Sequence, residues 1–598
     1  MVKPEFLRTT RCTSLKTERH LPLAVVLTLW SCFTVSAQQT QRIPDSAIRA
    51  TTRVVLVDAI VTDAASRVVS GLTASDFTVM EDGKPQKISF FSFESRTQRK
   101  VERPPRPLRS DVYTNRPEYH STSDPLVVLL LDGLNTPPGQ QVYVRQQILK
   151  YLGNLKLSGP GTAILALGND LSVLQDFTTD SQLLSAAVSS YKGGRTAVDI
   201  ESPRIDVPVT TGPGGGIPAQ ANVQAPPEAG RGGIDEAADV APGTNVLNSL
   251  QELADSLKRF ERNVTVDEQD VRVRTTLAAL RSIGHSVSGY PGRKALLWFS
   301  ASFPFNLAPE ESMDLEFSKS YRTQLSQTAV ILADANVAVY PIDARGLLTA
   351  GALADPSIPA TSGVPSKSLA SATWHKFNTE ATMDHLARDT GGKVFRNTND
   401  LNAALQDAIT DSESYYMLGY YPERKNWDGR FRNIKVALAD KHLKIRSRTG
   451  YFAVDPADWR KSGDGKQMIS PAALHTLTAT GILFYAHPEP PEKKGQPVTV
   501  EILVDASTVS FGSGPDFTQN TDLEFQAGAF TPDGKLARLE TQVAQADLRP
   551  ETYQQIMKNG ISIRVPLSLK PGRYLLRVAV RDNRNGHIGT LDVPLHVQ

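Results

Sequence analysis

Polar side chains with oxygen atoms follow several apolar runs of this chain, and their spacing suits metal or ligand binding. Asp132 comes directly after the run at 126–131, and Ser300 comes directly after the run at 295–299. The full set comprises Asp132, Asn135, Thr136, Thr196, Ser300, Ser302 and Asp343. Carboxylate and hydroxyl oxygens are the ligands that a hard cation such as Mg²⁺ prefers. The residues therefore suggest a divalent-cation site that protein oxygens and water share.

The elements that would position these residues are predicted from unbroken apolar runs. The runs occupy residues 126–131, 163–167, 295–299 and 337–342. Runs of this length are typical of strands that are covered on both faces. A helical stripe of Val273, Leu277 and Leu280 lies between two of them. The alternation predicts an α/β fold, an open, mostly parallel sheet with helices on both faces, and ligands bind such sheets beyond the carboxyl ends of the strands.

Two other interpretations of the same residues stay open. Asp132 and the threonines can cap helices and satisfy backbone groups at the strand ends, which needs no ligand. A hydrolase would need a nucleophile and a base, but the sequence has no Gly-x-Ser-x-Gly elbow and no His-Glu-x-x-His zinc motif. Both cysteines, Cys12 and Cys32, lie in the first 37 residues. The chain is therefore predicted not to be an enzyme.

Asp132-x-Leu134-x-Thr136, followed by Thr196 and Ser300, resembles the metal-ion-dependent adhesion site of von Willebrand factor type A (VWA) domains. The phrases LLLDGLNT, PGRKALLWFSASFPF, LARDTGGKVF and YYMLGYYP more closely resemble the VWFA-related proteins of acidobacteria, over about residues 54–453. The resemblance implies a VWA-like domain in which Asp132, Thr136, Thr196 and Ser300 form a degenerate site for Mg²⁺, Mn²⁺ or Ca²⁺. Leu134 replaces a serine of the family pattern, and Ser300 stands where that pattern has a second aspartate. The resemblance also implies that an acidic side chain of a partner completes the coordination.

The N-terminal 37 residues have the pattern of a secretory leader. Five Lys and Arg side chains precede an apolar stretch at 21–35, and Val35-Ser36-Ala37 fits a cleavage site. The apolar stretch is shorter than the roughly 20 residues that span a bilayer. Residues 38–598 hold 60 basic and 61 acidic side chains. We therefore expect an exported protein, periplasmic, associated with the outer envelope or extracellular, with no nucleic-acid partner and no transmembrane segment in the mature chain.

Composition shifts along the 598 residues predict several parts. Asp82-Gly83 between two apolar runs indicates a hairpin in the first β unit. The predicted parts are a leader at 1–37, a small β unit at 51–95, a Pro-rich linker at 96–123, a VWA-like domain at 124–455 and a β-sandwich at 470–598. The VWA-like domain is expected to contain a disordered insertion at 200–245, a loop at 346–373 and a terminal hairpin at 423–452.

These residues favour binding without catalysis as the function. We expect an exported adhesion-type protein that binds a protein partner through the strand-end face, on which Asn135, Ser302 and Asp343 lie. A weak divalent metal would assist this contact. The alternatives are a structural envelope module whose degenerate metal site is inert and, less favoured, a hydrolase that uses the same face.

Overall fold

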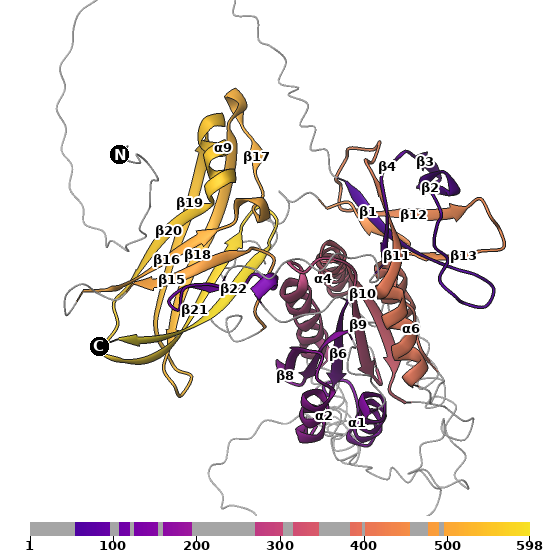
Figure 1. Cartoon of the computed structure of the whole chain (residues 1–598), viewed down its shortest axis with the longest axis horizontal. Coiled ribbons are helices and arrows are strands. Elements are labelled where there is room, and N and C mark those ends of the chain that lie inside the picture. Colours follow the sequence, from indigo (N-terminus) through magenta and orange to yellow (C-terminus); the bar gives the residue numbers. More distant parts are fainter. Residues whose placement is uncertain are drawn as a thin grey trace, which may run out of the picture.

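The protein is seen here as a computed structural model in which three groups of sheets follow one another in space (Figure 1). The N-terminal sheets lie on one side, a mostly parallel sheet lies in the middle, and a C-terminal sandwich lies on the other side. The structure describes residues 54–95, 107–119, 125–153, 160–193, 269–302, 315–345, 383–396, 401–454, 477–489 and 496–597.

The central sheet has the strand order β10-β9-β6-β7-β8, and only β8 runs antiparallel to its neighbour. Its strands are β6 (Leu126–Asp132), β7 (Gly161–Leu167), β8 (Leu171–Thr178), β9 (Lys294–Ser300) and β10 (Val337–Asp343). Every residue of β6, β7, β9 and β10 is buried. Burial on both faces is why these strands are unbroken apolar runs in the sequence.

Helices cover both faces of this central sheet. One face packs on α1 (Pro138–Gly153), α2 (Ser181–Ser190) and α6 (Leu401–Glu413) through a core that includes Leu129, Ile148 and Leu405. The other face packs on a helix described over residues 269–287 and on α4 (Leu315–Asp334). Asp180 is the N-cap of α2, and its side chain accepts hydrogen bonds from the backbone N–H groups of Gln182 and Leu183.

The N-terminal group consists of two four-stranded antiparallel sheets with the orders β13-β1-β11-β4 and β14-β12-β2-β3. Their strands are β1 (Val55–Thr62), β2 (Phe77–Glu81), β3 (Lys84–Gln86), β4 (Ile88–Ser95), β11 (Ser414–Tyr420), β12 (Phe431–Leu438), β13 (Lys444–Ser447) and β14 (Gly450–Phe452). Asp82 and Gly83 both have positive φ between β2 and β3, as a two-residue hairpin turn requires. Val57, Phe77 and Tyr416 contribute to the core of this group.

The C-terminal group is a sandwich of two antiparallel sheets with the orders β20-β16-β15-β5 and β17-β18-β21-β22, and β19 pairs with β18. Its strands are β5 (Tyr113–Thr114), β15 (Phe484–Glu489), β16 (Val498–Val504), β17 (Gly512–Ser513), β18 (Gln519–Phe530), β19 (Leu536–Leu548), β20 (Ile561–Leu567), β21 (Gly572–Asp582) and β22 (Ile588–Val597). The helix α9 (Pro550–Asn559) connects β19 to β20. Phe484, Phe525 and Val578 lie in the sandwich core.

The predicted fold class is wrong. Four of the five described sheets are antiparallel, and strands dominate the described residues, so the chain as a whole is not a VWA-like α/β protein. The helix-flanked, mostly parallel sheet is one sheet among five. The error has a physical cause. Strands that are buried on both faces form conspicuous apolar runs, whereas half-exposed antiparallel strands alternate in polarity and give a weaker signal.

Two predicted segments take part in sheets outside the central domain. Within 423–452, β12 pairs with β14 and also with β2, and β13 pairs with β1, so this segment belongs to the N-terminal sheets. The segment 96–123 is not only a linker, because β5 lies within it and pairs with β15. The leader at 1–37, the insertion at 200–245 and the loop at 346–373 lie outside the described residues.

Candidate functional site

The carboxyl ends of three neighbouring strands bring most of the predicted site residues to one edge of the central sheet. β6 ends at Asp132, β9 ends at Ser300 and β10 ends at Asp343. Since these strands are parallel, their ends meet at the same edge. All three residues are buried, and Asp132 is only 2% exposed.

Protein donors occupy both oxygens of the Asp132 carboxylate. Oδ1 accepts from the backbone N–H of Asn135 at 2.9 Å and from its side-chain Nδ2 at 3.1 Å. Oδ2 accepts from the same Nδ2 at 2.9 Å, from Trp298 Nε1 at 3.0 Å and from Ser300 Oγ at 2.8 Å. Burial raises the pKa of Asp132, while the hydrogen bonds from Asn135, Ser300 and Trp298 act in the opposite direction.

The neighbouring polar groups are also bonded to one another. Arg272 donates to Asn135 Oδ1 at 3.1 Å and to Ser302 Oγ at 3.2 Å. Thr136 Oγ1 accepts from the backbone N–H of Ala301 at 3.1 Å. These bonds fix the loop after β6 against the end of β9 and the helix at 269–287. We call this set of bonded residues the Asp132 cluster: Asp132, Asn135, Thr136, Arg272, Trp298, Ser300 and Ser302.

The Asp132 cluster does not fit a divalent cation. A cation needs free oxygen lone pairs, but N–H and O–H donors point at both oxygens of Asp132, and a guanidinium lies beside Asn135 and Ser302. No group of three or more His, Cys, Asp or Glu side chains placed to hold a metal occurs among the described residues. Thr196, the remaining predicted ligand, lies outside them.

Asp343 does not join the cluster. Its two oxygens accept from Arg345 Nε at 2.9 Å and Arg345 Nη2 at 2.7 Å, which makes a two-pronged ion pair at the end of β10. The hydrogen-bond partners described for Ser300, Ser302 and Asp343 include no histidine or lysine that could serve as a base.

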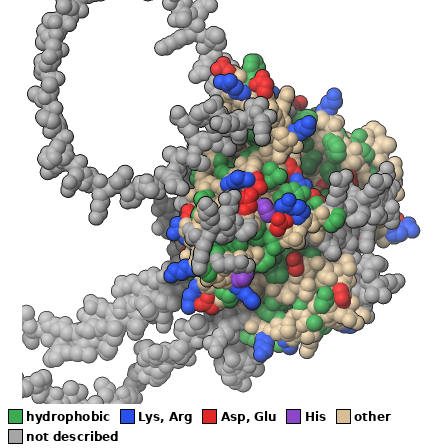
Figure 2. Space-filling model, turned by 60° about the vertical axis from the view of Figure 1, so that its left-hand side comes forward, with side chains coloured by type: hydrophobic (Ala, Val, Ile, Leu, Met, Phe, Trp, Pro, Cys, Tyr) green, Lys and Arg blue, Asp and Glu red, His purple; other side chains and the backbone are tan. Residues whose placement is uncertain are grey.

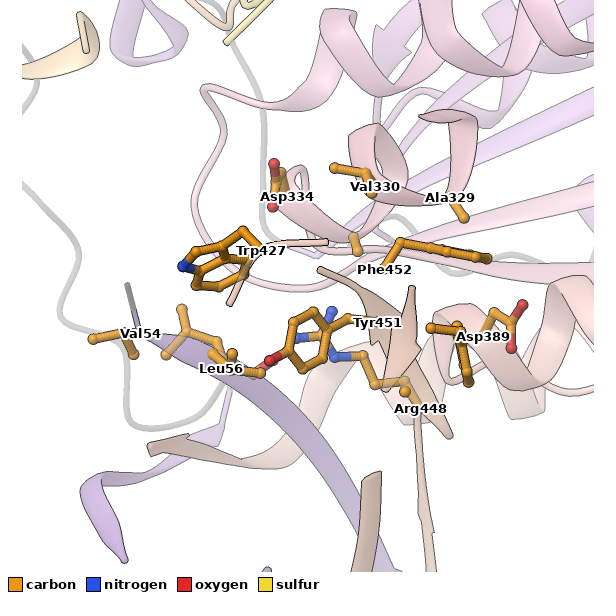
Figure 3. A pocket seen from close by; sticks show the side chains of 14 residues that line it. Val54, Leu56, Ala329, Val330, Asp334, Asp389, Trp427, Arg448, Tyr451 and Phe452 are labelled. Carbon is orange, nitrogen blue, oxygen red and sulfur yellow. The ribbon is translucent and has the colours of Figure 1, made fainter. Parts of the chain in front are cut away.

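A cleft that no sequence motif indicated lies between the N-terminal sheets and α4 and has a volume of about 150 Å³ (Figure 3). Asp334 and Val330 of α4 lie along one wall, and Leu56, Tyr451 and Arg448 lie along the other. Trp427 lies toward one end of the cleft, and Asp389 lies toward the other end. We call this the aromatic cleft, and its lining also includes Val54, Phe431 and Phe452.

Bonds behind the aromatic cleft hold its walls in place. The buried guanidinium of Arg432 donates to the backbone oxygens of Arg424 and Asn426 and lies 5.5 Å from the centre of the Trp427 ring. Tyr451 donates to Glu81 Oε2 at 3.1 Å, and burial raises the pKa of the Tyr451 hydroxyl. Arg448 donates to the backbone oxygen of Leu56.

The carboxyl group of Asp389 lies toward the end of the cleft opposite Trp427. It accepts from Thr449 Oγ1 at 3.2 Å. Burial raises the pKa of Asp389, while the nearby charges of His385 and Arg388 and the bond from Thr449 act in the opposite direction.

A row of exposed apolar side chains adjoins the cleft, on the face of the sheet β13-β1-β11-β4 that is turned away from the core residues Val57 and Tyr416. Leu56, Gly419 and Phe90 stand opposite one another on three adjacent strands, and Leu56 and Phe90 are each 48% exposed. Val54 is 39% exposed, and Tyr421, just after β11, is 48% exposed. We call these five residues the apolar row. A Cβ at Gly419 would lie 2.9 Å from Cβ of Phe90, so the glycine lets the two outer side chains approach.

Two segments of the sequence could have predicted the apolar row. The segments RVVLVDAIV and ISFFSF carry apolar residues at successive positions rather than at alternate ones. In an antiparallel strand, such a run places apolar side chains on both faces, and one of these faces remains outside the core.

Comparisons with known proteins give no family for this chain. No family model matches it, and no curated protein matches it. Among the solved structures that match is a chain described as "Crystal Structure of Bacteroides Uniformis beta-glucuronidase", with 12% identity and a TM-score of 0.13. The match covers 32% of this chain and 20% of that one, so the chain spans about a fifth of that structure's length. At this TM-score the likeness supports no statement about fold or activity, and the resemblance to VWFA-related proteins stays a prediction.

No helix within the described ranges is both long enough and apolar enough to cross a bilayer. The face of the molecule drawn in Figure 2 mixes acidic and basic side chains with hydrophobic ones.

Proposed function

We propose that this chain is a non-enzymatic binding protein that recognises a protein partner through the apolar row. The observation that carries the proposal is the alignment of Leu56, Gly419 and Phe90 across three strands, with two large side chains about half exposed. Contiguous exposed apolar groups are costly in a monomer and mark contact surfaces. Large apolar and aromatic anchors supply most of the binding energy in protein interfaces.

The strand-end face supports binding less well. Asp132, Asn135, Thr136 and Ser300 are all buried and bonded to other protein groups. A partner's acidic side chain would meet no free cation there and would have to replace bonds that the fold already makes. We therefore place the proposed partner on the apolar row rather than at the strand ends. The leader predicted at 1–37 supports an exported location for this encounter.

A capture experiment with a double variant tests the proposal. The full chain, carrying a photo-crosslinker at Ser92 of β4, is exposed to a cell-envelope extract, and cross-linked proteins are identified by mass spectrometry. Replacing two anchors, Leu56→Thr and Phe90→Thr, keeps the preference for strand but removes apolar contact area. We expect this double variant to reduce capture of the specific partner by about tenfold or more.

The matched control is Val173→Thr on β8, because Val173 is 46% exposed on a strand of a different sheet. This variant should capture as much partner as the wild type. Equal capture by the double variant and the wild type contradicts the proposal. Failure of the wild-type chain to capture any specific partner favours an inert structural role.

A further inference from the structure

We infer that the aromatic cleft receives one arginine or lysine side chain from the partner segment that covers the apolar row. This inference rests on the proposed function, because it names the chemistry of the partner that the apolar row binds. The aromatic cleft and the apolar row are continuous, since Val54 and Leu56 belong to both. A segment lying on the apolar row therefore carries a neighbouring residue to the mouth of the cleft.

The size of the cleft favours a single side chain. Its volume of about 150 Å³ is below the ~300 Å³ at which sites for small organic ligands begin. Apolar walls from Val54, Leu56 and Val330 suit a methylene stem, and aromatic rings lie beside them. Lys and Arg combine an apolar stem with a charged head, so both parts of such a side chain find a matching surface.

The charges of the cleft favour a cation. Its lining contains two carboxylates, from Asp334 and Asp389, and one guanidinium, from Arg448. Arg448 donates a hydrogen bond to the backbone oxygen of Leu56, and the negative charges of Asp58 and Asp334 interact favourably with its guanidinium. Aromatic faces also attract cations, most strongly when the ring is tryptophan. Over the whole cleft the lining therefore carries two carboxylates against one guanidinium, which is complementary to a guanidinium or an ammonium group.

The walls of the cleft are already held in place, so a side chain can enter without rearranging them. Arg432 fixes the turn that carries Trp427 through two backbone oxygens, and Glu81 holds the hydroxyl of Tyr451. A wall that is already ordered loses little conformational entropy when a side chain enters. The aromatic rings therefore stand in binding position before the partner arrives.

Labelled peptides provide the test. Four fluorescein-labelled hexapeptides, identical except for arginine, lysine, citrulline or glutamate at one central position between leucines, are titrated with the full chain by fluorescence polarisation. Citrulline keeps the shape of arginine but has no charge. We expect the arginine and lysine peptides to bind about three- to tenfold more tightly than the citrulline peptide.

Asp334→Asn should bring the arginine-to-citrulline ratio close to one and leave the affinity for the citrulline peptide unchanged. Asp334 is exposed, so the variant is not expected to disturb the fold. The control is Asp170→Asn, which removes an exposed carboxylate at the turn between β7 and β8 and should preserve the ratio.

The peptide outcomes separate this inference from the proposed function. Leu56→Thr with Phe90→Thr should weaken all four peptides alike, because the apolar row contacts the leucines. Equal binding of arginine and citrulline peptides overturns the cationic assignment and leaves the apolar row intact. Tightest binding of the glutamate peptide also overturns it and assigns the cleft to Arg448. If no peptide binds at millimolar concentration, the cationic assignment is also overturned. The proposed function is then tested by the capture experiment only.

Discussion

At the scale of single residues, the Asp132 carboxylate is the common acceptor for several of the polar residues at the strand ends. Three side chains and one backbone N–H supply its hydrogen bonds, and Trp298 is a donor that the motif did not include. The sequence does not reveal that Trp298 donates to Asp132, because a tryptophan within an apolar strand is expected to serve only as a core residue. The residues fit a network that ties the loop after β6 to β9.

Metal titration tests this interpretation of Asp132. Calorimetric titration with Mg²⁺ or Mn²⁺ should give no binding heat, and neither ion should shift the thermal midpoint, since protein donors fill the carboxylate. Asp132→Ala should lower the free energy of unfolding by about 2–4 kcal/mol, because buried donors lose their acceptor. A metal-dependent shift in the wild type that disappears in Asp132→Ala contradicts this prediction.

A second residue-scale prediction concerns His285, on the helix at 269–287. Burial, together with the charges of His587 and Arg281, lowers the pKa of His285 to about 3. The unfolded state takes up a proton as the pH falls through about 6.5, whereas the folded state stays neutral until about pH 3. His285 therefore contributes stability above pH 6.5 that is progressively lost as the pH falls toward 3.

Replacing His285 should remove this part of the pH dependence. The difference in thermal midpoint between wild type and His285→Gln should change between pH 7 and pH 4, with the wild type losing more stability on acidification. The carboxylates of the chain titrate in both proteins, so the comparison isolates the histidine. A difference that stays constant across this range would show that His285 does not titrate as expected.

At the scale of elements, the short strand β5 converts a predicted linker into part of the sandwich. Asn115, just after β5, is 0% exposed; its side chain donates to the backbone oxygens of Ala479 and Ile482 and accepts from the N–H of Phe484. Thr114 donates to the backbone oxygen of Phe484, and Arg116 pairs with Asp505. These bonds attach the segment around β5 to residues 479–505 of the sandwich, more than 360 positions later in the sequence.

Asn115→Ala should lower the free energy of unfolding of the sandwich by about 1–3 kcal/mol, because three buried backbone groups lose their partner. Urea denaturation, followed by hydrogen exchange in β15, measures the change. Asn559→Ala at the exposed end of α9 is the control and should stay within about 0.5 kcal/mol of wild type. Similar behaviour of the two variants would mean that β5 is a passive linker.

At the scale of the whole molecule, a buried ion pair joins the N-terminal sheets to the central sheet. Arg293, just before β9, lies 3.3 Å from Asp58 of β1 and donates to the backbone oxygen of Gly391 at 2.7 Å. Its own N–H donates to the hydroxyl of Tyr415 at 3.0 Å. Both charges are buried, so removing either one would leave the other uncompensated between the two groups of sheets.

Asp58→Ala should cost about 3–5 kcal/mol of unfolding free energy, because it leaves the Arg293 charge buried without its partner. The double variant Asp58→Leu with Arg293→Met should recover most of that loss, since it buries no charge. Breaking the exposed pair of Lys393 and Asp407 with Asp407→Ala serves as the control and should cost under about 1 kcal/mol. A cost below about 1 kcal/mol for Asp58→Ala would contradict this role.

The sequence by itself determined the local features of this protein. The apolar runs locate β6, β7, β9 and β10, the Asp82-Gly83 pair locates a hairpin, and the strand ends bring Asp132 close to Ser300. Each of these follows from a short stretch of residues, through burial on both faces of a strand or through the backbone conformation that a turn requires.

The tertiary structure alone decided the fold class, the partner of each antiparallel strand and the position of the aromatic cleft. The backbone N–H of Leu72 donates a hydrogen bond to the hydroxyl of Tyr416, and β1 pairs with β11 and β13 across hundreds of intervening residues. Such pairings leave no trace in local composition, because strand pairing depends on which exposed edges and faces remain available after the rest of the chain has packed. The apolar row and the aromatic cleft exist only where these distant strands meet.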